Sequence, residues 1–247
     1  MEFGIYDINV STPLKFKERL NVYKKVGFSS IGLYIDENYM ENNESYEDII
    51  TYAKNIGLKI NQVHVCYKLS NDICNNSENY IEYMNKKLEI CEKYNIKNMV
   101  LHASKGDNPP EINEKQIEMI IKLANNHPSV NLAFENVRNN TNLEKILNSK
   151  TKNITFCFDM GHANAYKSFD LLDKFADKIT CTHLHNNHGA DTHELLSLGE
   201  IDYKPIINKL KDLNADICLE VFPERRTNLS SVEFENFVKQ AFNDLAL

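Results

Sequence analysis

The residues of this chain best suited to chemistry are its histidines and a few acidic residues, and both kinds follow short apolar runs. Seven of the eight histidines, all except His127, lie at or just beyond the end of such a run. Glu135, Asp159 and Glu220 end other runs in the same way. Imidazoles and carboxylates together suit Zn, Mn, Co or Fe(II), and the lack of cysteine in the set argues against a structural zinc held by thiolates. The residue types therefore predict a divalent-metal site.

Eight short apolar runs rich in β-forming residues recur along the chain, and each predicts a strand. They are Phe3–Ile8, Ser30–Ile35, Lys59–Val65, Lys97–His102, Val130–Glu135, Ile154–Asp159, Ile179–His185 and Asp216–Val221. The segments between them have helical periodicity and capping signals, such as Thr12 before one helix and Ser45 to Asp48 before the next. Strands that alternate with helices every ~30 residues indicate parallel strands joined by right-handed crossovers.

The expected fold class is α/β: a single (β/α)8 TIM barrel of eight parallel strands that spans residues 1–247 as one domain. A chain of 247 residues suits such a barrel, which typically has about 250 residues. An open doubly wound sheet would more often have a glycine-rich turn after its first strand, and no such turn follows Ile8. In a barrel the C-terminal ends of all strands converge on one mouth, where active sites lie. The histidines and acids would thus become neighbours.

Each residue also has a simpler interpretation when it is considered alone. A histidine at a strand end is more often a hydrogen-bonded structural group, and a carboxylate there commonly caps the following helix. We interpret His127 as an ordinary loop residue and His188 as a solvated one. The simpler interpretation loses force when seven histidines and three acids share one end of a barrel, so the whole set favours metal binding. Crowded carboxylates would also repel one another unless cations or protons intervened.

Composition and charge argue against several other classes of protein. The net charge is −7 and no stretch concentrates Lys and Arg, so nucleic acid is not expected as the primary partner, although a local basic patch stays compatible with the sequence. No stretch approaches about 18 uninterrupted apolar residues, and the first residues do not form a secretory signal, so we expect no membrane span. The six cysteines include no CxxC pair and are expected to be reduced, which predicts a cytoplasmic protein.

At its predicted strand ends the chain carries an ordered series of short motifs. They are Val63-His64-Val65, Val100-Leu101-His102, Phe134-Glu135-Asn136, Phe158-Asp159-Met160-Gly161-His162, His183-Leu184-His185-Asn186-Asn187-His188-Gly189, Asp191-Thr192-His193 and Leu219-Glu220. In this order the set resembles the xylose isomerase-like barrel superfamily, which includes sugar phosphate isomerases and epimerases and also endonuclease IV. The resemblance covers essentially the whole chain and implies the same barrel fold.

The resemblance to the sugar epimerases implies four ligands for one metal ion. They are Glu135, Asp159, Glu220 and one histidine of the seventh strand. His183 and His185 share the same inward parity on that strand, so both are candidates. The family pattern His-x-x-Asp favours His183 and places Asn186 where the family has aspartate. That departure leaves the role of Asn186 open.

Endonuclease IV-like members carry five further ligands and bind three metal ions, and counterparts of these ligands are also present. They are His64, His102, His162, Asp191 and His193. By this resemblance, the first ion lies between His64, His102 and a bridging Glu135. The second lies between Asp159, His183 and Glu220. The third lies between His162, Asp191 and His193. We therefore expect one to three divalent ions per chain, with Zn or Mn favoured.

Other features depart from the nuclease pattern. The stretch after Glu135 lacks the small, glycine-containing sequence associated with those nucleases. The expected Gly-x-Gly before Ile201 survives only as Ser-Leu-Gly-Glu at positions 197–200. The chain is also short and acidic, which leaves little room for long loops that insert side chains into DNA.

Two enzyme classes follow from these features. We place first a metal-dependent isomerase or epimerase of a sugar, sugar phosphate or related polyol, in which the metal stabilises an enediolate and Glu135 and Glu220 transfer protons as the catalytic pair. The alternative is a multinuclear-zinc phosphoesterase related to endonuclease IV, because an enediolate mechanism does not need His64, His102 or the Asp191/His193 pair. A barrel that only stores or senses metal is a third interpretation.

Further residues near the predicted mouth are candidates for contact with a small carbohydrate or phosphoester substrate. They are His185, Asn186, Lys105 and Arg138. For Lys105 and Arg138, solvated surface charge is the simpler interpretation. The sequence does not determine the oligomeric state and is compatible with a homodimer.

Overall fold

Eight parallel strands form the centre of the structure. The computed structural model describes residues 3–7, 11–35, 45–223 and 228–245. The strands are β1 (Phe3–Tyr6), β2 (Ser30–Tyr34), β3 (Lys59–His64), β4 (Asn98–His102), β5 (Asn131–Glu135), β6 (Ile154–Asp159), β7 (Ile179–His183) and β8 (Ile217–Leu219). Neighbours pair in parallel in the order β7-β6-β5-β4-β3-β2-β1-β8, and two isolated parallel bridges, Cys181 with Asp216 and Leu184 with Leu219, connect the two ends of this order. The expected (β/α)8 TIM barrel of the α/β class is confirmed.

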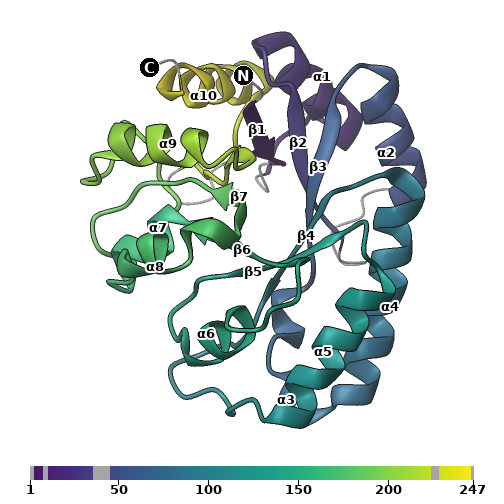
Figure 1. Ribbon diagram of the computed structural model, residues 1–247. Helices are drawn as coiled ribbons and strands as arrows, with labels where there is room; N and C mark the ends of the chain where they lie inside the picture. Colours follow the sequence, from purple (N-terminus) through teal and green to yellow (C-terminus); the bar gives the residue numbers. More distant parts are fainter. Residues whose placement is uncertain (1–2, 8–10, 36–44, 224–227, 246–247) are drawn as a thin grey trace.

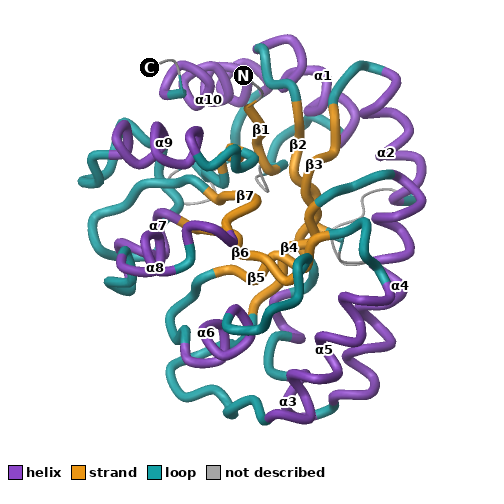
Figure 2. The backbone as a smooth tube through the Cα atoms, viewed as in Figure 1, coloured by secondary structure: helices purple, strands orange, loops and turns teal. Residues whose placement is uncertain are grey.

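Helices surround the strands on the outside, as Figures 1 and 2 show. They are α1 (Phe16–Val26), α2 (Tyr46–Asn55), α3 (Asp72–Asn75), α4 (Ser77–Tyr94), α5 (Glu114–Asn126), α6 (Thr141–Leu147), α7 (Met160–Ala165), α8 (Asp170–Lys174), α9 (Tyr203–Asp212) and α10 (Ser231–Asp244). Each longer helix buries one apolar stripe; α5, for example, buries Ile120, Leu123 and Ala124, which have the three- and four-residue spacing of one helix face. The main core therefore lies between the helices and the outer face of the barrel.

Local capping signals explain where two of the early helices begin. Oγ of Ser45 accepts a hydrogen bond from the N–H of Asp48, and the Asp48 carboxylate accepts one from the N–H of Ser45, so the predicted capping box of α2 is confirmed. The N-cap predicted at Thr12 is wrong. Oγ1 of Thr12 accepts the N–H of Leu14 in a turn that precedes the helix, and α1 begins only after Lys15.

β6 has the predicted bounds, β2 to β5 are each one residue shorter than predicted, and the first, seventh and eighth strands differ more. β7 ends at His183 rather than His185, because the chain beyond it is held by isolated bridges, one of which pairs Asn186 with Glu194. β8 covers only Ile217–Leu219 rather than Asp216–Val221. Ile8, predicted at the end of the first strand, lies outside the described residues.

Small side chains fill the barrel interior directly below the strand ends. Val100, Ala133, Cys157 and Cys181 form a buried cluster of their own, which we call the interior layer. Each of them stands two residues before the last residue of its strand. Because side chains alternate between the two faces of a strand, the last residues point into the barrel as well. The interior layer thus forms the floor beneath them.

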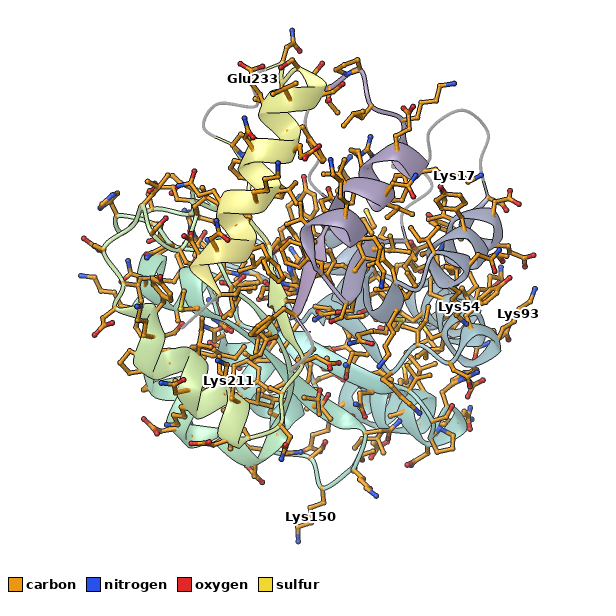
Figure 3. All side chains as sticks on the ribbon, turned by 90° about the horizontal axis from the view of Figure 1, so that it is seen from above. Lys17, Lys54, Lys93, Lys150, Lys211 and Glu233 are labelled. Carbon is orange, nitrogen blue, oxygen red and sulfur yellow. The ribbon has the colours of Figure 1, made fainter. Side chains whose placement is uncertain are left out.

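Lysine side chains from many elements reach the surface of the molecule. The labelled residues Lys17, Lys54, Lys93, Lys150 and Lys211 come from different helices and loops and lie around the outside in Figure 3. This spread differs from the single basic face that is typical of proteins which follow a phosphate backbone. Within the described ranges, no helix combines the length and the apolar content that a membrane span requires.

Candidate metal centre

Five consecutive strands each end on a candidate ligand. β3 ends at His64, β4 at His102, β5 at Glu135, β6 at Asp159 and β7 at His183. Glu220 directly follows β8. The parallel register pairs His102 with Glu135 and Asp159 with His183, so the structure brings these side chains together at the C-terminal end of the barrel, as the sequence predicts.

The first group of donor atoms is the His64 cluster, which consists of His64, His102 and Glu135. Nε2 of His64 and Nε2 of His102 both lie 3.1 Å from Oε2 of Glu135. Nδ1 of His64 donates a hydrogen bond to the carbonyl oxygen of Val65 at 2.7 Å. A histidine that binds metal through one nitrogen usually donates the other to such an acceptor, so Nε2 of His64 is the nitrogen available for an ion.

The second group is the His183 cluster, which consists of Glu135, Asp159, His183 and Glu220. All four are buried, and Nδ1 of His183 lies 3.2 Å from Oε2 of Glu220 and 3.3 Å from Oε2 of Glu135. Within the described part of the chain, neither nitrogen of His183 nor Oδ2 of Asp159 has a hydrogen-bond partner. Buried polar atoms are nearly always paired, and one shared cation would satisfy these atoms together. Of the two histidines that the sequence left open, the geometry places His183 in this cluster.

The third group is the His193 cluster, which consists of His162, His185, Asp191 and His193. Nε2 of His193 lies 3.1 Å from Oδ1 of Asp191, and Nε2 of His162 lies 3.4 Å from Oδ2 of the same residue. The rings of His185 and His193 stack with their centroids 3.9 Å apart. The family resemblance implied His162, Asp191 and His193 for this group, and the structure adds His185.

The spacing of the donor atoms suits a tetrahedral ion. Zinc lies about 2.0–2.1 Å from nitrogen and oxygen ligands, which places neighbouring corners of the tetrahedron about 3.3–3.4 Å apart. The contacts within the clusters run from 3.1 to 3.9 Å, and the ligand atoms of each cluster all lie within 4.8 Å of one another. The residues present therefore fit a divalent ion, which would draw the more distant ligands inward.

Mutual charge pairing favours the ionised forms of Glu135, His183 and His193. Burial would raise the pKa of Glu135, but His183 and neighbouring histidines outweigh this effect and hold the pKa well below its usual value. Burial would lower the pKa of His183, but Glu135 and Glu220 raise it well above its usual value. Burial would also lower the pKa of His193, but the acidic neighbours, chiefly Asp191, outweigh this effect and raise the pKa to about 9. Protons on the histidines thus balance the carboxylates when no other cation does.

The segment after β6 explains why Asp159 and His162 both reach the centre. Asp159 is the N-cap of α7, and its Oδ1 accepts the N–H of His162 at 2.6 Å. Asn136 holds the same segment, because its amide exchanges two hydrogen bonds with the backbone of Asp159, at 2.7 and 2.8 Å. The backbone carbonyl oxygen of Asn136 also accepts a hydrogen bond from Nδ1 of His162 at 2.9 Å. Asn136 was not among the predicted site residues, although its place beside Glu135 was a usable signal.

Two tyrosines that the sequence analysis also missed border the centre. Tyr34, the last residue of β2, donates a hydrogen bond to Oε1 of Glu220. Tyr6, the last residue of β1, packs edge-on against His183 with ring centroids 4.8 Å apart. Both tyrosines occupy the same strand-end position as the ligands. Their position at a strand end could have identified them, but only histidines and acids at strand ends were predicted as site residues.

Asn186, a predicted substrate contact, holds the loop after β7 in place. It is fully buried. Its amide nitrogen donates to the carbonyl oxygens of Leu196 and Ile201, and its Oδ1 accepts the N–H groups of Asn187 and Ile201. These four bonds use the hydrogen-bonding capacity of the amide, so the structure gives Asn186 a positioning role rather than a surface that faces a ligand.

The two basic residues predicted near the mouth differ in their surroundings. Lys105 is exposed, and its ammonium lies 4.9 Å from the centre of the Tyr67 ring. Arg138 is also exposed and pairs with Asp107 at 2.7 Å. The Arg138 guanidinium lies 5.3 Å from the ring of Tyr166, a residue whose hydroxyl donates to Oδ2 of Asp191. Arg138 therefore borders the His193 cluster. Lys105 instead belongs to an exposed loop and lies over the ring of Tyr67.

The two histidines predicted to lie in loops are found away from the donor clusters. His188 is exposed, and its Nε2 lies 3.0 Å from the carbonyl oxygen of Leu198, which agrees with a solvated loop residue. His127 follows the last turn of α5 and is buried. Its ring lies between Asn85 and Glu92 of α4, so His127 joins two helices rather than standing free in a loop.

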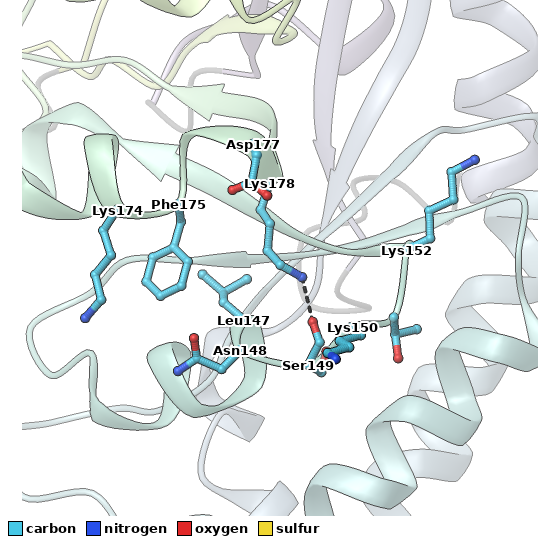
Figure 4. Close-up of a pocket in the computed structure, with 10 residues that line it drawn as sticks. Leu147, Asn148, Ser149, Lys150, Lys152, Lys174, Phe175, Asp177 and Lys178 are labelled. Atoms are coloured by element: carbon cyan, nitrogen blue, oxygen red, sulfur yellow. Dashed lines mark hydrogen bonds between the residues drawn. The ribbon is translucent and has the colours of Figure 1, made fainter.

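A separate pocket contains none of the candidate ligands. Its volume is about 500 Å³, and it is lined by Leu147, Asn148, Ser149, Lys150, Thr151, Lys152, Lys174, Phe175, Asp177 and Lys178. Figure 4 shows the hydrogen bond within it from Lys178 to the carbonyl oxygen of Ser149, at 2.8 Å. These residues precede β6 and β7, so the pocket lies at the N-terminal ends of the strands. Active sites of such barrels are built at the other end.

The sequence of this barrel matches a known family. The family model described as xylose isomerase-like TIM barrel matches residues 20–236, a range that includes every candidate ligand. The chain belongs to this family. The resemblance noted from the strand-end motifs is thereby confirmed.

One curated relative matches part of this xylose isomerase-like barrel. An uncharacterized protein of Methanocaldococcus jannaschii is 28% identical to it over 159 residues. The match covers 57% of this chain and 61% of the relative, so it spans less than two thirds of the relative's length.

Solved structures share the fold of this xylose isomerase-like barrel along its length. L-ribulose 3-epimerase is 17% identical with a TM-score of 0.76, over 100% of this chain and 94% of that one. The IolI protein with a bound zinc atom is 18% identical with a TM-score of 0.78, over 99% and 96%. The 3-keto-D-glucoside 4-epimerase YcjR from E. coli is 15% identical with a TM-score of 0.74, over 100% of both chains. At these identities the likeness shows the fold.

Proposed function

We propose that this protein is a divalent-metal-dependent isomerase or epimerase that acts on a sugar, a sugar phosphate or a related polyol. The observation that carries the proposal is the His183 cluster, in which three buried carboxylates and one buried imidazole from four strand ends have donor atoms close enough for one ion. The fold shared with L-ribulose 3-epimerase and 3-keto-D-glucoside 4-epimerase supports it.

Glu135 and Glu220 are suited to move a proton between the faces of a substrate. They approach the same nitrogen of His183, at 3.3 and 3.2 Å, and the pKa of each is held low against the effect of burial, with His183 the largest opposing influence. A bound divalent ion would act there as a Lewis acid toward a carbonyl oxygen and an adjacent hydroxyl oxygen. One glutamate, in its ionised form, takes the proton from the carbon beside the carbonyl. The proton that returns to the opposite face or to the neighbouring carbon comes from a glutamate that has first become protonated, by this abstraction or by uptake of a proton from solvent.

A hydrogen bond from Tyr34 gives the two carboxylate oxygens of Glu220 different roles. Its hydroxyl donates to Oε1, while Oε2 lies 3.2 Å from Nδ1 of His183. The hydrogen bond fixes the rotation of the carboxylate, so that only Oε2 turns toward the donor atoms of the His183 cluster. We infer that Tyr34 positions Glu220 for its part in the reaction.

Replacement of Glu135 by Gln tests the proposal directly. The amide cannot accept a proton and is a poorer ligand, so kcat/KM is expected to fall by about 10²–10⁴-fold or more. The measurement is deuterium uptake from solvent into a panel of ketoses and ketose phosphates, together with chromatography of the products. The matched control is Glu118→Gln, which changes an exposed glutamate of α5. Full activity of the Glu135→Gln variant would remove this residue from the mechanism.

A second function, phosphoester hydrolysis by several zinc ions, is favoured by the two other clusters. Glu135 belongs to both the His64 cluster and the His183 cluster, which is the arrangement expected of a carboxylate that bridges two ions. The test is elemental analysis on protein purified without chelators, followed by assays on abasic DNA and small phosphodiesters. About three equivalents of metal with hydrolysis and no deuterium uptake would replace the first proposal by this one.

A further inference from the structure

We propose that His185 is a fourth protein ligand in the His193 cluster and that it closes this site around a structural ion. The inference rests on the proposed metal centre and goes beyond it in assigning a task to the third ion. Zinc sites with four protein ligands are structural, whereas catalytic sites keep one position open for water or substrate. The ion of the His193 cluster thus holds the loops of the barrel mouth and takes no part in the chemistry at the His183 cluster.

Neither nitrogen of the buried His185 ring makes a hydrogen bond. His185 is fully buried, and among the residues that the structure describes, neither of its ring nitrogens has a hydrogen-bond partner. Nε2 lies 3.2 Å from Oδ1 of Asp159, but this contact does not have the geometry of a hydrogen bond. Since buried polar groups are nearly always satisfied, the unused nitrogens of this ring point to a ligand.

Residue 161 leaves room for this ring. A β carbon built on Gly161 would lie 2.0 Å from Cε1 and 2.1 Å from Nδ1 of His185, far inside van der Waals contact. In the space that glycine leaves, the ring lies against His162 and His193, and one ligand atom of each of these three histidines and of Asp191 lies within 4.8 Å of the others. Because an imidazole holds its ion in the ring plane, binding of one ion by His185 and His193 would turn the two rings out of their parallel stack. Three imidazoles therefore gather with Asp191 around one centre.

The backbone of His193 adopts an uncommon conformation. Its φ is 52°, in the left-handed region that non-glycine residues adopt uncommonly. Nδ1 of His193 donates to the carbonyl oxygen of Glu220 at 2.9 Å, which leaves Nε2 beside Asp191. Unfavourable backbone conformations persist where the surrounding structure enforces them, and they concentrate at functional sites. An ion bound by four side chains supplies such a constraint.

The ligand types point to zinc in the His193 cluster. Three imidazoles and one carboxylate form a tetrahedral nitrogen-rich set, which suits Zn²⁺ better than the harder Mg²⁺ or Mn²⁺. The His183 cluster has three carboxylates and one imidazole, and that oxygen-rich set accepts Mn²⁺ as well. One chain can therefore carry a fixed zinc at one site and an exchangeable ion at the other.

The experiment compares the metal affinity of the wild type with that of His185→Gln. Both proteins are purified without chelators, dialysed against a zinc chelator of moderate strength and measured by elemental analysis. Wild type is expected to retain about one equivalent of zinc that the variant loses, with zinc affinity lowered by about tenfold or more. After replacement by cobalt(II), the visible absorption of a tetrahedral site is expected in the wild type and not in the variant. The matched control, His188→Gln, changes an exposed histidine of the same loop and should behave as wild type.

Two results would overturn the proposal. One is a His185→Gln variant that keeps the same zinc and the same cobalt spectrum. The other comes from anomalous X-ray diffraction of zinc-loaded wild-type crystals, which needs no variant and therefore does not depend on its folding. A zinc peak about 2.0–2.1 Å from a ring nitrogen of His185 is expected, and a peak with water in that position, or no peak, contradicts it. Neither measurement uses a sugar assay, so a failure of the proposed function would leave both results interpretable.

Discussion

At the residue scale, Asp159 divides its two carboxylate oxygens between a helix and the metal centre. Oδ1 caps α7 through the N–H of His162. In the part of the chain that is described, Oδ2 has no hydrogen bond, and it lies 3.9 Å from Nδ1 of His183. A strand-end carboxylate was expected either to cap a helix or to bind metal. The geometry makes both roles available to one side chain, because each needs a different oxygen.

Replacing Asp159 with Asn or with Ala separates the two roles. Asparagine is as good an N-cap as aspartate but lacks the anionic oxygen, whereas alanine can serve neither role. In the presence of a chelator, Asp159→Ala is expected to be less stable than Asp159→Asn by about 1 kcal/mol, measured by urea unfolding. Both variants should bind less metal than wild type. Equal stability of the two variants would show that the cap contributes little.

At the scale of elements, a buried ion pair joins the end of β1 to α1. The Arg19 guanidinium contacts both oxygens of the Asp7 carboxylate, at 2.9 and 2.7 Å, and the hydroxyl of Tyr23 donates to the same carboxylate at 2.9 Å. Asp7 and Arg19 are both buried. Such a bidentate pair fixes the direction in which the chain leaves β1 and sets α1 against the barrel.

Asp7→Asn should destabilise the protein far more than Tyr23→Phe. The first change leaves the Arg19 charge buried without its counter-charge, which costs about 3–5 kcal/mol. The second removes one hydrogen bond, worth about 1 kcal/mol. Urea unfolding with unchanged m-values measures both. Similar effects of the two variants would mean that the ion pair contributes no more than the hydrogen bond.

The fold was accessible from the sequence because buried parallel strands are apolar on both faces and therefore form short apolar runs. Their ends were less accessible, since they depend on pairing between distant segments, as where β7 gives way to isolated bridges after His183. Alternation within a strand shows that His183 and His185 both point inward. Which cluster each one joins depends on the space beside Gly161, and no local pattern encodes that space.

The predicted site was incomplete for a related reason. Residue types that bind metal predict the strand-end histidines and acids but not Tyr34 and Asn136. Tyr34 and Asn136 contribute to the centre through hydrogen bonds to Glu220 and Asp159. These bonds form only when separate strands lie side by side. Such supporting residues follow from position in the barrel rather than from ligand chemistry.

At the scale of the whole molecule, the two ends of the chain close the barrel together. β1 pairs with both β2 and β8, and α10 packs beside α1. Phe28 and Phe242 meet edge-on with centroids 5.1 Å apart, and Lys25 pairs with Glu235 at 2.8 Å. The exposed ion pair adds little, so the aromatic contact and the strand pairing hold this closure.

Removal of metal is expected to lower the melting temperature of the whole barrel. An ion present at 100 times its Kd stabilises the folded state by about 2.7 kcal/mol. In a chain of this size each kcal/mol shifts Tm by about 2–4 °C, so loss of one such ion should lower Tm by about 5–10 °C. Calorimetry with and without a chelator measures the shift, and added zinc should reverse it. An unchanged Tm in protein shown to have lost its metal would contradict the prediction.

The candidate ligands are spread over most of the chain, and this affects when a metal ion can bind during folding. Tyr34 and Glu220, which share a hydrogen bond, stand 186 residues apart in the chain, and the candidate ligands come from six of the eight strands or the segments after them. Contacts this distant in sequence form late, after the intervening chain has become ordered. Because the His183 cluster includes Glu220, an ion held there by all four side chains cannot nucleate this barrel in the way that zinc nucleates a small zinc-binding domain. Complete loading of that cluster is therefore expected only after ring closure.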